Sequence, residues 1–439
     1  MLLTALLLVF PAAGQGVQGV QGDSGADRQR MAATRAGGLA PSLPPPEDGS
    51  RMRVFLMTVA PGPAVWERFA HNTIVYYLYD TDDRPLTVSF NWGVFSFDDG
   101  FYWNFARKDL EYYLVAADFE AELDGYIRGQ GRDVVLQELA LSPGQKRSLF
   151  TDIRTTLDTN PAYAYDYYLD NCSTRVRDHL DRALDGALAE AWQGTGGEPG
   201  QTPRPTLRFH TSRSMADTPL WAPVVMALGP VGDEPLDRWA EAFLPMRLRA
   251  FMNDVRVPDA SGERVPLVSR ELVLHAAGNY AVPGEPPVRW PGFLLAGVVL
   301  GGGVAAGARS GRRWLVRVAA GLVAAVGLLA GLVGVVLAFM IFFTGHWPVR
   351  WNPNALHFVP FWLILAWAGA GWIGFGRLRR TARISAGLVA GCSLAGLLAA
   401  LVFGFGDMNG LVLMLPTTLG VLAAVWTKRT DNPTAKELT

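Results

Sequence analysis

Five long apolar segments in the last third of the chain constrain its fold more than any other feature. They extend over residues 292–308, 318–343, 357–376, 384–405 and 411–427. These segments approach or exceed the roughly 18 residues that cross a bilayer core. They also lack the polar face that a buried helix of a soluble protein would show. The sequence therefore predicts five transmembrane helices, and it leaves a separate soluble region before them.

The basic residues between these segments predict how the helices are oriented. Arginine and lysine cluster at residues 309–317, 377–383 and 428–429, after the first, third and fifth segments. The other two connections contain only Arg350 or the acidic Asp407. Because short basic loops stay on the cytoplasmic side, we expect the soluble region to face outward. The outward loop 345–354 contains two tryptophans, which are typical of a membrane interface. The alternative interpretation of this region is that Asn352, Asn354 or His357 contacts lipid headgroups.

The remaining chain divides into segments of different composition. Residues 1–14 predict a signal peptide or N-terminal anchor, and residues 15–50 predict a disordered tether rich in Gly, Pro and Ser. We expect one soluble domain over residues 51–288, the transmembrane domain over 291–428 and a cytoplasmic tail over 429–439. A net charge of -1 argues against nucleic-acid binding. Two cysteines, and six histidines outside metal-ligand spacing, predict no metal site.

The soluble region alternates strand-like and helix-like segments. Runs rich in β-branched and aromatic residues predict strands at 54–59, 73–79, 86–90 and 134–140, with a turn at 80–83. Helical periodicity follows at 142–157 and again after Asn171. We expect a surface loop at 189–206, and an amphipathic helix within 229–252 that is interrupted or ended near Pro245. The pattern predicts an α+β domain with helices packed on an antiparallel sheet.

Cys172 is the candidate nucleophile, because it stands directly before the helix predicted after Asn171. A helix N-terminus carries partial positive charge and free N–H groups, which favour a thiolate and could hold an oxyanion. Arg175 and Arg177 add positive charge nearby. Most free cysteines are small buried core residues, which is the simpler interpretation. Cys392 lies among small residues in the fourth apolar segment and is expected only to pack.

A catalytic cysteine needs a base, and His71 is the strongest candidate. His71 opens a predicted strand that can hold its ring rigidly, and Asn91, at the end of the next strand, could orient it. His179 lies two helical turns beyond Cys172, about 10 Å away. His210 falls in a polar stretch with no predicted strand or helix, and His275 suits packing or an interface.

These motifs together resemble the Lnb-type bacterial lipoprotein N-acyltransferase family. The resemblance rests on an aromatic-x-His-Asn that opens a strand, a later Asn-Trp-Gly-x-Phe, and Asn-Cys-Ser-Thr-Arg at a helix start. It covers about residues 50–260. His71 matches the motif histidine and Cys172 the motif cysteine, whereas Ala70 stands where the family usually has Gly. The order of histidine strand before cysteine helix is similar to that of permuted papain-like enzymes.

The resemblance implies a periplasmic thiol acyltransferase in the bacterial inner membrane. The acyl chain would pass from a phospholipid, through a thioester on Cys172, to the N-terminal amine of a lipoprotein, with no cofactor. Cys172, His71 and Asn91 would be catalytic. Substrate contacts are expected from the remaining motif residues, Asn72, Trp92, Asn171 and Arg175.

Two other functions fit the residues alone. A cell-wall thiol peptidase or amidase of the NlpC type uses related cysteine chemistry in the same compartment. A non-enzymatic envelope scaffold would use Cys172 and His71 only for structure. The acyl acceptor, the chain preference and the role of the helices beyond anchoring are not encoded in any motif of the sequence.

Overall fold

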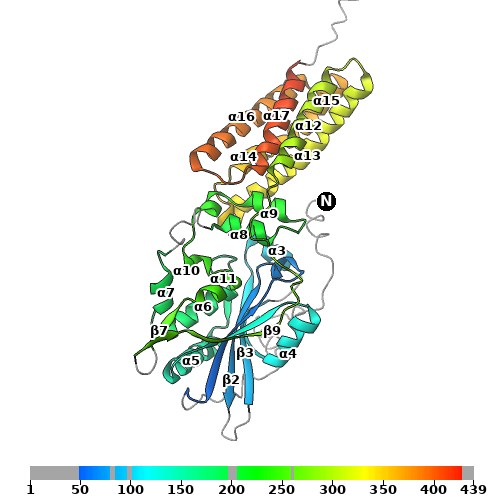
Figure 1. The fold of residues 1–439 in the computed structure, drawn as a ribbon. Coiled ribbons are helices and arrows are strands. Elements are labelled where there is room, and N and C mark those ends of the chain that lie inside the picture. Colours follow the sequence, from blue (N-terminus) through cyan, green and yellow to red (C-terminus); the bar gives the residue numbers. More distant parts are fainter. Residues whose placement is uncertain (1–48, 80–84, 96–100, 196–204, 259–261, 428–439) are drawn as a thin grey trace, which may run out of the picture. The chain divides into compact units, whose positions relative to one another are not determined.

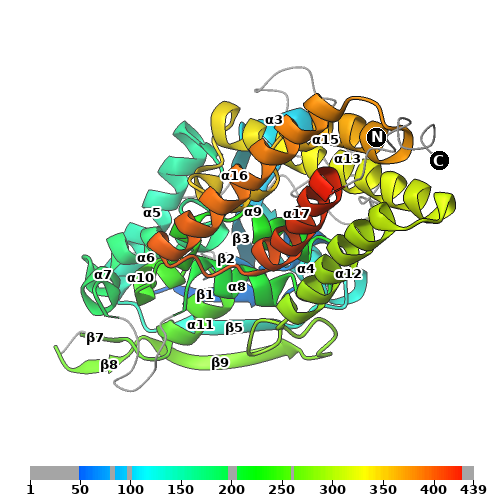
Figure 2. The same cartoon turned by 90° about the horizontal axis from the view of Figure 1, so that it is seen from above.

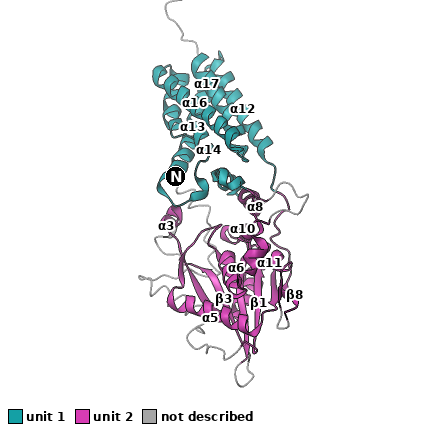
Figure 3. Cartoon of the chain, turned by 90° about the vertical axis from the view of Figure 1, so that its left-hand side faces the viewer, with its two compact units in different colours: residues 1–9, 219–234, 286–439 teal, residues 10–218, 235–285 magenta. Residues whose placement is uncertain are grey.

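The computed structural model describes residues 49–79, 85–95, 101–195, 205–258 and 262–427. It contains two compact units (Figure 3). Among the described residues, the sheet unit comprises 49–218 and 235–285, and the helical unit comprises 219–234 and 286–427. The predicted signal peptide, most of the predicted tether, the turn at 80–83 and the predicted cytoplasmic tail lie outside the described residues.

The sheet unit is built on seven strands, all paired antiparallel, in the order β6-β4-β3-β2-β1-β5-β9. Figure 1 labels β2, β3 and β9 of this sheet. Their bounds are β1 Met52–Val59, β2 His71–Tyr79, β3 Pro85–Val94, β4 Glu111–Asp118, β5 Val134–Leu139, β6 Ala162–Ala164 and β9 Val268–His275. A separate hairpin pairs β7 Arg256–Pro258 with β8 Arg264–Pro266. The α+β class and the antiparallel sheet are confirmed.

Both faces of the central strands are buried, which explains their nearly continuous apolar sequence. Val54 and Leu56 of β1 point into the larger core, whereas Phe55 and Met57 point into a smaller core on the opposite face. Such alternation follows from the two-residue period of a strand. The helices α5 and α6 pack on the larger core, and α4 packs on β3 and β4 at the smaller one.

The helices of the sheet unit are mostly short. Their bounds are η2 Val65–Glu67, α3 Phe101–Arg107, α4 Phe119–Asp124, η3 Gly125–Gly129, α5 Pro143–Thr159, α6 Cys172–Ala183, α7 Ala187–Trp192, α8 Leu207–Ser214, α10 Arg238–Glu241 and α11 Pro245–Met252. Helix α5 begins with a capping box, in which Ser142 and Gln145 bond each other's backbone N–H. The helix predicted within 229–252 is interrupted near Pro245, as expected: α10 ends at Glu241 and Pro245 opens α11, because the first turn needs no N–H donor there. Part of the loop predicted at 189–206 belongs to α7.

The helical unit contains five helices long and apolar enough to cross a membrane. Its elements are α9 Trp221–Ala227, η4 Pro230–Asp233, α12 Trp290–Arg309, α13 Arg313–Phe343, η5 Trp347–Val349, α14 Asn354–His357, α15 Phe361–Phe375, α16 Arg379–Phe403 and α17 Asn409–Thr427. The view in Figure 2 separates α12, α16 and α17. The five predicted spans are confirmed, the third being formed by α14 and α15 together.

Small residues let these helices approach closely. A Cβ added at Gly420 of α17 would lie 2.1 Å from the carbonyl oxygen of Gly301 in α12. Close backbone approach of this kind is the usual means of packing helices in lipid. The loop before α14 is fixed within the same unit, since Asn352 and Asn354 donate to the carbonyl of Met226 at 2.8 and 2.9 Å. These amide nitrogens are thus engaged inside the protein.

Ala70, the residue before β2, has a left-handed backbone with φ of +71°. For a non-glycine residue that conformation costs about 1–2 kcal/mol. It is tolerated here because Ala70 makes a turn that aligns β2 with β1, pairing His71 with Val59. The strand that carries His71 therefore begins at a strained position, which explains why glycine suits the motif there.

The strain at Ala70 gives a stability prediction. Ala70→Val places a β-branched side chain at positive φ and should lower the free energy of unfolding by about 2 kcal/mol. In Ala70→Gly the relief of strain is offset by the lost methyl group and by glycine's backbone entropy, so we expect little change. Thermal unfolding followed by tryptophan fluorescence in detergent should show a drop of about 4–8 °C for the valine variant. Equal unfolding temperatures for both variants would contradict the assigned backbone conformation.

Candidate active site

Cys172 is the first residue of α6, and Asn171 caps this helix. The Asn171 side-chain oxygen accepts hydrogen bonds from the N–H groups of Ser173 at 2.9 Å and Thr174 at 3.0 Å. Its amide nitrogen donates to the carbonyls of Tyr167 at 2.8 Å and Phe243 at 3.0 Å. Asn171 is buried and fully bonded, so it fixes where the helix starts and thereby where the thiol lies.

The Asn72 side chain ties the start of β2 to the start of α6. Asn72 is completely buried, and its oxygen accepts a hydrogen bond from Thr58 at 2.9 Å. Its nitrogen donates to Ser173 Oγ at 3.1 Å and to the Pro245 carbonyl at 3.4 Å. One buried amide thus links β1, β2, α6 and α11. This link places the cysteine helix beside the strand that begins with the histidine.

Cys172 is only 9% exposed, and its surroundings are aromatic and basic. The backbone N–H groups of Asn72, Ser173 and Cys172 lie near the sulfur and, like the charge of Arg132, lower its pKa. Tyr112 and Tyr163 lie close enough for electrostatic coupling to the thiol, and Tyr112 also stacks on Tyr165. The sulfur therefore sits among N–H donors that could hold an oxyanion.

His71 is held by Asn91, as predicted from the spacing. His71 Nε2 and Asn91 Oδ1 are 2.8 Å apart, and the Asn91 nitrogen donates to Glu122 Oε1 at 2.5 Å. Because a carboxylate only accepts, the amide oxygen must face the imidazole, and His71 Nε2 carries the hydrogen. The hydroxyl of Tyr126 also donates to Glu122, at 3.1 Å. This chain leaves Nδ1 as the basic nitrogen of His71, and no described residue forms a hydrogen bond with it.

The thiol and the imidazole lie at the same end of β2 but are not bonded to each other. Strand alternation puts the Asn72 side chain on the face covered by α6, and it puts those of His71 and Asn91 on the face covered by α4. The sulfur lies near the backbone N–H of Asn72, the residue next to His71. Within the described residues, no hydrogen bond joins Cys172 to His71. Catalytic bonds are often absent from unliganded sites and form only with substrate.

Burial makes both groups neutral. It raises the pKa of the Cys172 thiol to about 11, an effect that the backbone N–H groups and Arg132 oppose but do not overcome. It also lowers the pKa of His71 to about 4, aided by Arg132 and opposed by the bond to Asn91. The thiolate expected from the helix N-terminus is therefore not the resting state, because desolvation outweighs the helix field.

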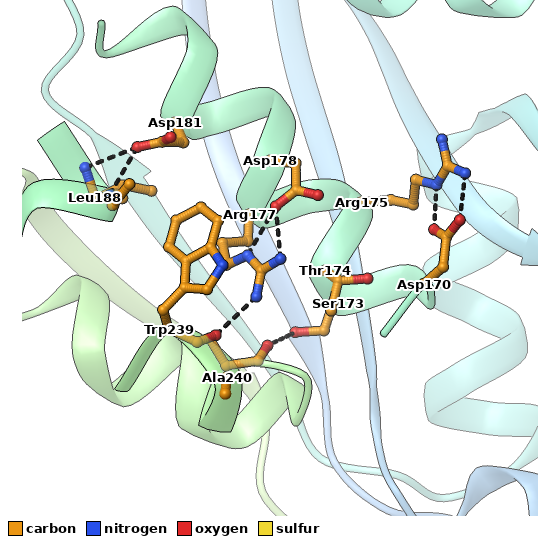
Figure 4. A network of polar contacts seen from close by, with 12 residues as sticks. Asp170, Ser173, Thr174, Arg175, Arg177, Asp178, Asp181, Leu188, Trp239 and Ala240 are labelled. Carbon is orange, nitrogen blue, oxygen red and sulfur yellow. Dashed lines mark hydrogen bonds and ion pairs between the residues drawn. The ribbon is translucent and has the colours of Figure 1, made fainter. Parts of the chain in front are cut away.

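All four residues predicted to bind substrate have contacts inside the protein. Trp92 is fully buried and packs against His179, with ring centroids 4.9 Å apart. Arg175 forms a two-point ion pair with Asp170 (Figure 4) and lies over the ring of Tyr163 at 4.4 Å. The other two, Asn72 and Asn171, are bonded as described above. Substrate contact by these four side chains stays a prediction, whereas their contacts with other residues of the protein are seen in the structure.

The other candidate histidines belong to separate polar clusters. His179 Nδ1 is 2.7 Å from Asp152 Oδ2, and burial lowers its pKa. His210 lies in α8, where the sequence predicted neither strand nor helix, and is 2.9 Å from Glu241 Oε1. His275 Nδ1 is 2.9 Å from the Arg132 carbonyl at the end of β9. Each of the three has a structural partner of its own.

Three residues of the site were missed by the sequence analysis. Glu122 orients Asn91, Arg132 acts electrostatically on both His71 and Cys172, and Gly93 packs against the imidazole. Gly93 alone carried a signal, since it stands two residues after Asn91 in the quoted motif. Within the described residues there is no group of three or more His, Cys, Asp or Glu that could hold a metal ion.

The fold and the helices together define a multi-pass membrane protein with an α+β soluble domain. Residues 47–212 match the family model of the Lnb N-terminal periplasmic domain, and this match confirms the resemblance to the Lnb-type family. It spans less than half of the 439 residues and includes His71, Asn91 and Cys172. Searches of curated proteins and of solved structures found no match. The sheet unit thus carries a periplasmic domain.

The pKa of Cys172 can be tested by alkylation with iodoacetamide in a Cys392→Ser background. Only the thiolate reacts, so the rate should rise about tenfold per pH unit through neutrality and level off only near the pKa of about 11. A plateau at or below pH 7 would show a preformed thiolate and contradict the neutral resting state.

Gly93 provides a test of the packing around His71. Its φ is +145°, and a Cβ there would lie 3.0 Å from Cε1 of His71. Gly93→Ala should destabilise the protein by about 2–3 kcal/mol, from backbone strain plus displacement of the ring. Gly186→Ala is the matched control, because its φ is +86° with open space around it, and about 1 kcal/mol is expected. If denaturant unfolding shows that Gly93→Ala and Gly186→Ala lower the free energy of unfolding equally, the imidazole does not occupy this position.

Proposed function

We propose that this chain is an acyltransferase that moves a fatty-acyl chain from a phospholipid, through an acyl-Cys172 thioester, to the N-terminal amine of bacterial lipoproteins. The observation that carries the proposal is a thiol at a helix N-terminus that lies near the backbone N–H of Asn72, directly after the Asn91-bound His71. The Lnb N-terminal periplasmic domain and five candidate membrane helices support it. We place the protein in the bacterial inner membrane with its soluble domain in the periplasm.

The first half-reaction forms the thioester. His71 Nδ1 takes the thiol proton as Cys172 sulfur attacks the ester carbonyl, so that charge develops only during attack. The N–H groups at the start of α6 and at Asn72 stabilise the oxyanion. When the intermediate collapses, the C–O bond breaks and the imidazolium of His71 protonates the departing lysophospholipid alkoxide. The products are acyl-Cys172 and a lysophospholipid.

The second half-reaction releases the acyl chain to an amine. The lipoprotein amine attacks the thioester and His71 accepts its proton, while the C–N bond forms and the C–S bond breaks. The imidazolium then returns a proton to the Cys172 thiolate. Because an α-amine has a reference pKa near 8, we expect this step to accelerate as the pH rises toward that value. His71, with its pKa of about 4, is neutral throughout this range.

The membrane helices would place the reaction at the membrane surface. A domain joined to five spanning helices stays near the membrane surface, where both a phospholipid and a lipidated N-terminus reside. Asn91 and Glu122 would act as positioning residues, since they hold the ring of His71 through a two-step hydrogen-bond chain. The start of α6 would supply the nucleophile and the oxyanion donors together.

Mass spectrometry of the purified full chain tests this function. After incubation with phospholipid, a hydroxylamine-labile fatty-acyl adduct should appear on Cys172 and be absent in Cys172→Ala. His71→Gln should slow its formation by at least about a hundredfold, because a positioned general base contributes 10²–10⁴-fold. Cys392→Ser is the matched control and should form the adduct at the wild-type rate.

Two outcomes would contradict the proposed function. Release of peptidoglycan fragments without any acyl adduct would assign the site to a thiol peptidase. If the protein shows a normal unfolding transition but forms no acyl adduct and cleaves no peptidoglycan, Cys172 and His71 would have a structural role only.

A further inference from the structure

Two buried arginines flank the loop that follows β1. Arg132 is 3% exposed and its Nε donates to the Ala60 carbonyl at 2.7 Å. Arg68 is 6% exposed and its Nη1 donates to the Gly62 carbonyl at 3.4 Å. The two guanidinium groups therefore contact the same short loop, residues 60–63.

Each guanidinium keeps one buried nitrogen without a partner among the described residues. These atoms are Nη2 of Arg132 and Nε of Arg68. Arg132 pairs with a carboxylate oxygen of Glu67 at a distance of 4.0 Å. Its guanidinium also donates to the side-chain oxygen of Gln130 at 3.0 Å and lies over the ring of Tyr126. Asp217, the partner of Arg68, is largely exposed. A buried cation with an unmet donor is costly unless something else binds it.

The arginine pair lies beside the candidate active site. Strand β1 ends at Val59, which pairs with His71, and the loop 60–63 continues from there. The charge of Arg132 acts on both His71 and Cys172, and Tyr280 interacts electrostatically with both arginines. Positive charge thus extends from the thiol and imidazole toward Arg68.

We propose that Arg132 and Arg68 form a phosphate-binding site that takes the headgroup phosphodiester of the glycerophospholipid acyl donor. This inference rests on the proposed function. A guanidinium presents several N–H donors in a plane that matches phosphate oxygens, and it stays charged when partly desolvated. In a glycerophospholipid only a few bonds of glycerol separate the phosphate from the ester. A phosphate held by Arg132 therefore leaves the ester within reach of Cys172.

Donor selectivity of the full chain in detergent micelles tests this site. Adduct formation on Cys172 is compared for dioleoyl phosphatidylglycerol and for neutral dioleoylglycerol. We expect wild type to prefer the phospholipid by about tenfold or more. Arg132→Gln should bring the ratio of the two rates close to one, and this ratio is the readout because Arg132 also acts electrostatically on Cys172 and His71. Arg132→Lys keeps the charge and should retain part of the preference. Arg128→Gln removes an exposed arginine of the neighbouring η3 and should behave as wild type.

A binding measurement separates failure of this site from failure of the proposed function. The probes are sn-glycero-3-phosphoglycerol and inorganic phosphate, and the readout is the unfolding temperature. The glycerophosphodiester should raise it in wild type and not in Arg132→Gln. If this shift occurs but no lipid acylates Cys172, the anion site stands and the acyltransferase proposal fails.

Three results would overturn the phosphate site. The first is an equal fractional loss on both lipids in Arg132→Gln, which leaves the lipid preference intact and would restrict Arg132 to its electrostatic effect on Cys172 and His71. The second is stabilisation by inorganic phosphate with none by the glycerophosphodiester, which would assign the site to free phosphate. The third is the absence of any shift together with an unchanged lipid preference.

Discussion

The buried amide of Asn72 is the interaction on which the arrangement of the site depends. Its hydrogen bonds to Thr58, Ser173 and Pro245 join two strands to the helix that begins at Cys172. A buried amide that loses its partners costs more than an exposed one, so this junction has little freedom to shift. The backbone on one side of Asn72 carries His71, and its own N–H reaches the sulfur. The proposed nucleophile and the proposed base are therefore placed by one residue whose side chain reacts with neither.

Low exposure to water determines the chemistry available at this junction. Burial favours the neutral thiol and the neutral imidazole, so separating charge between them in the resting protein is unfavourable. The N–H groups around the sulfur stabilise negative charge only when it develops. Arg132 adds a fixed positive charge that also disfavours the imidazolium. A site of this kind is suited to proton transfer concerted with attack.

Much of the fold followed from local sequence patterns. The apolar segments, the central strands β1, β2, β3 and β5, and the helices α5 and α6 all carry periodicity that their burial explains. The pairing of His71 with Asn91 was also predictable, because adjacent antiparallel strands bring their ends together.

Glu122 and Arg132 were not predictable, since they reach the site from segments remote in sequence. Strands β4, β6 and β9, and the helix that contains His210, have short or mixed patterns that only tertiary packing decides. The protonation state of Cys172 was misjudged because burial cannot be read from helix position alone.

The central claim is that Cys172 and His71 act as one reactive unit at the end of β2. The most direct measurement is the rate of N-acylation of a lipoprotein substrate by Cys172→Ala, His71→Ala and the double variant in membranes. Residues that act as a unit are strongly non-additive. We predict that each single variant loses nearly all activity and that the double variant is no worse. A His71→Ala protein that retains close to the wild-type rate would contradict this account.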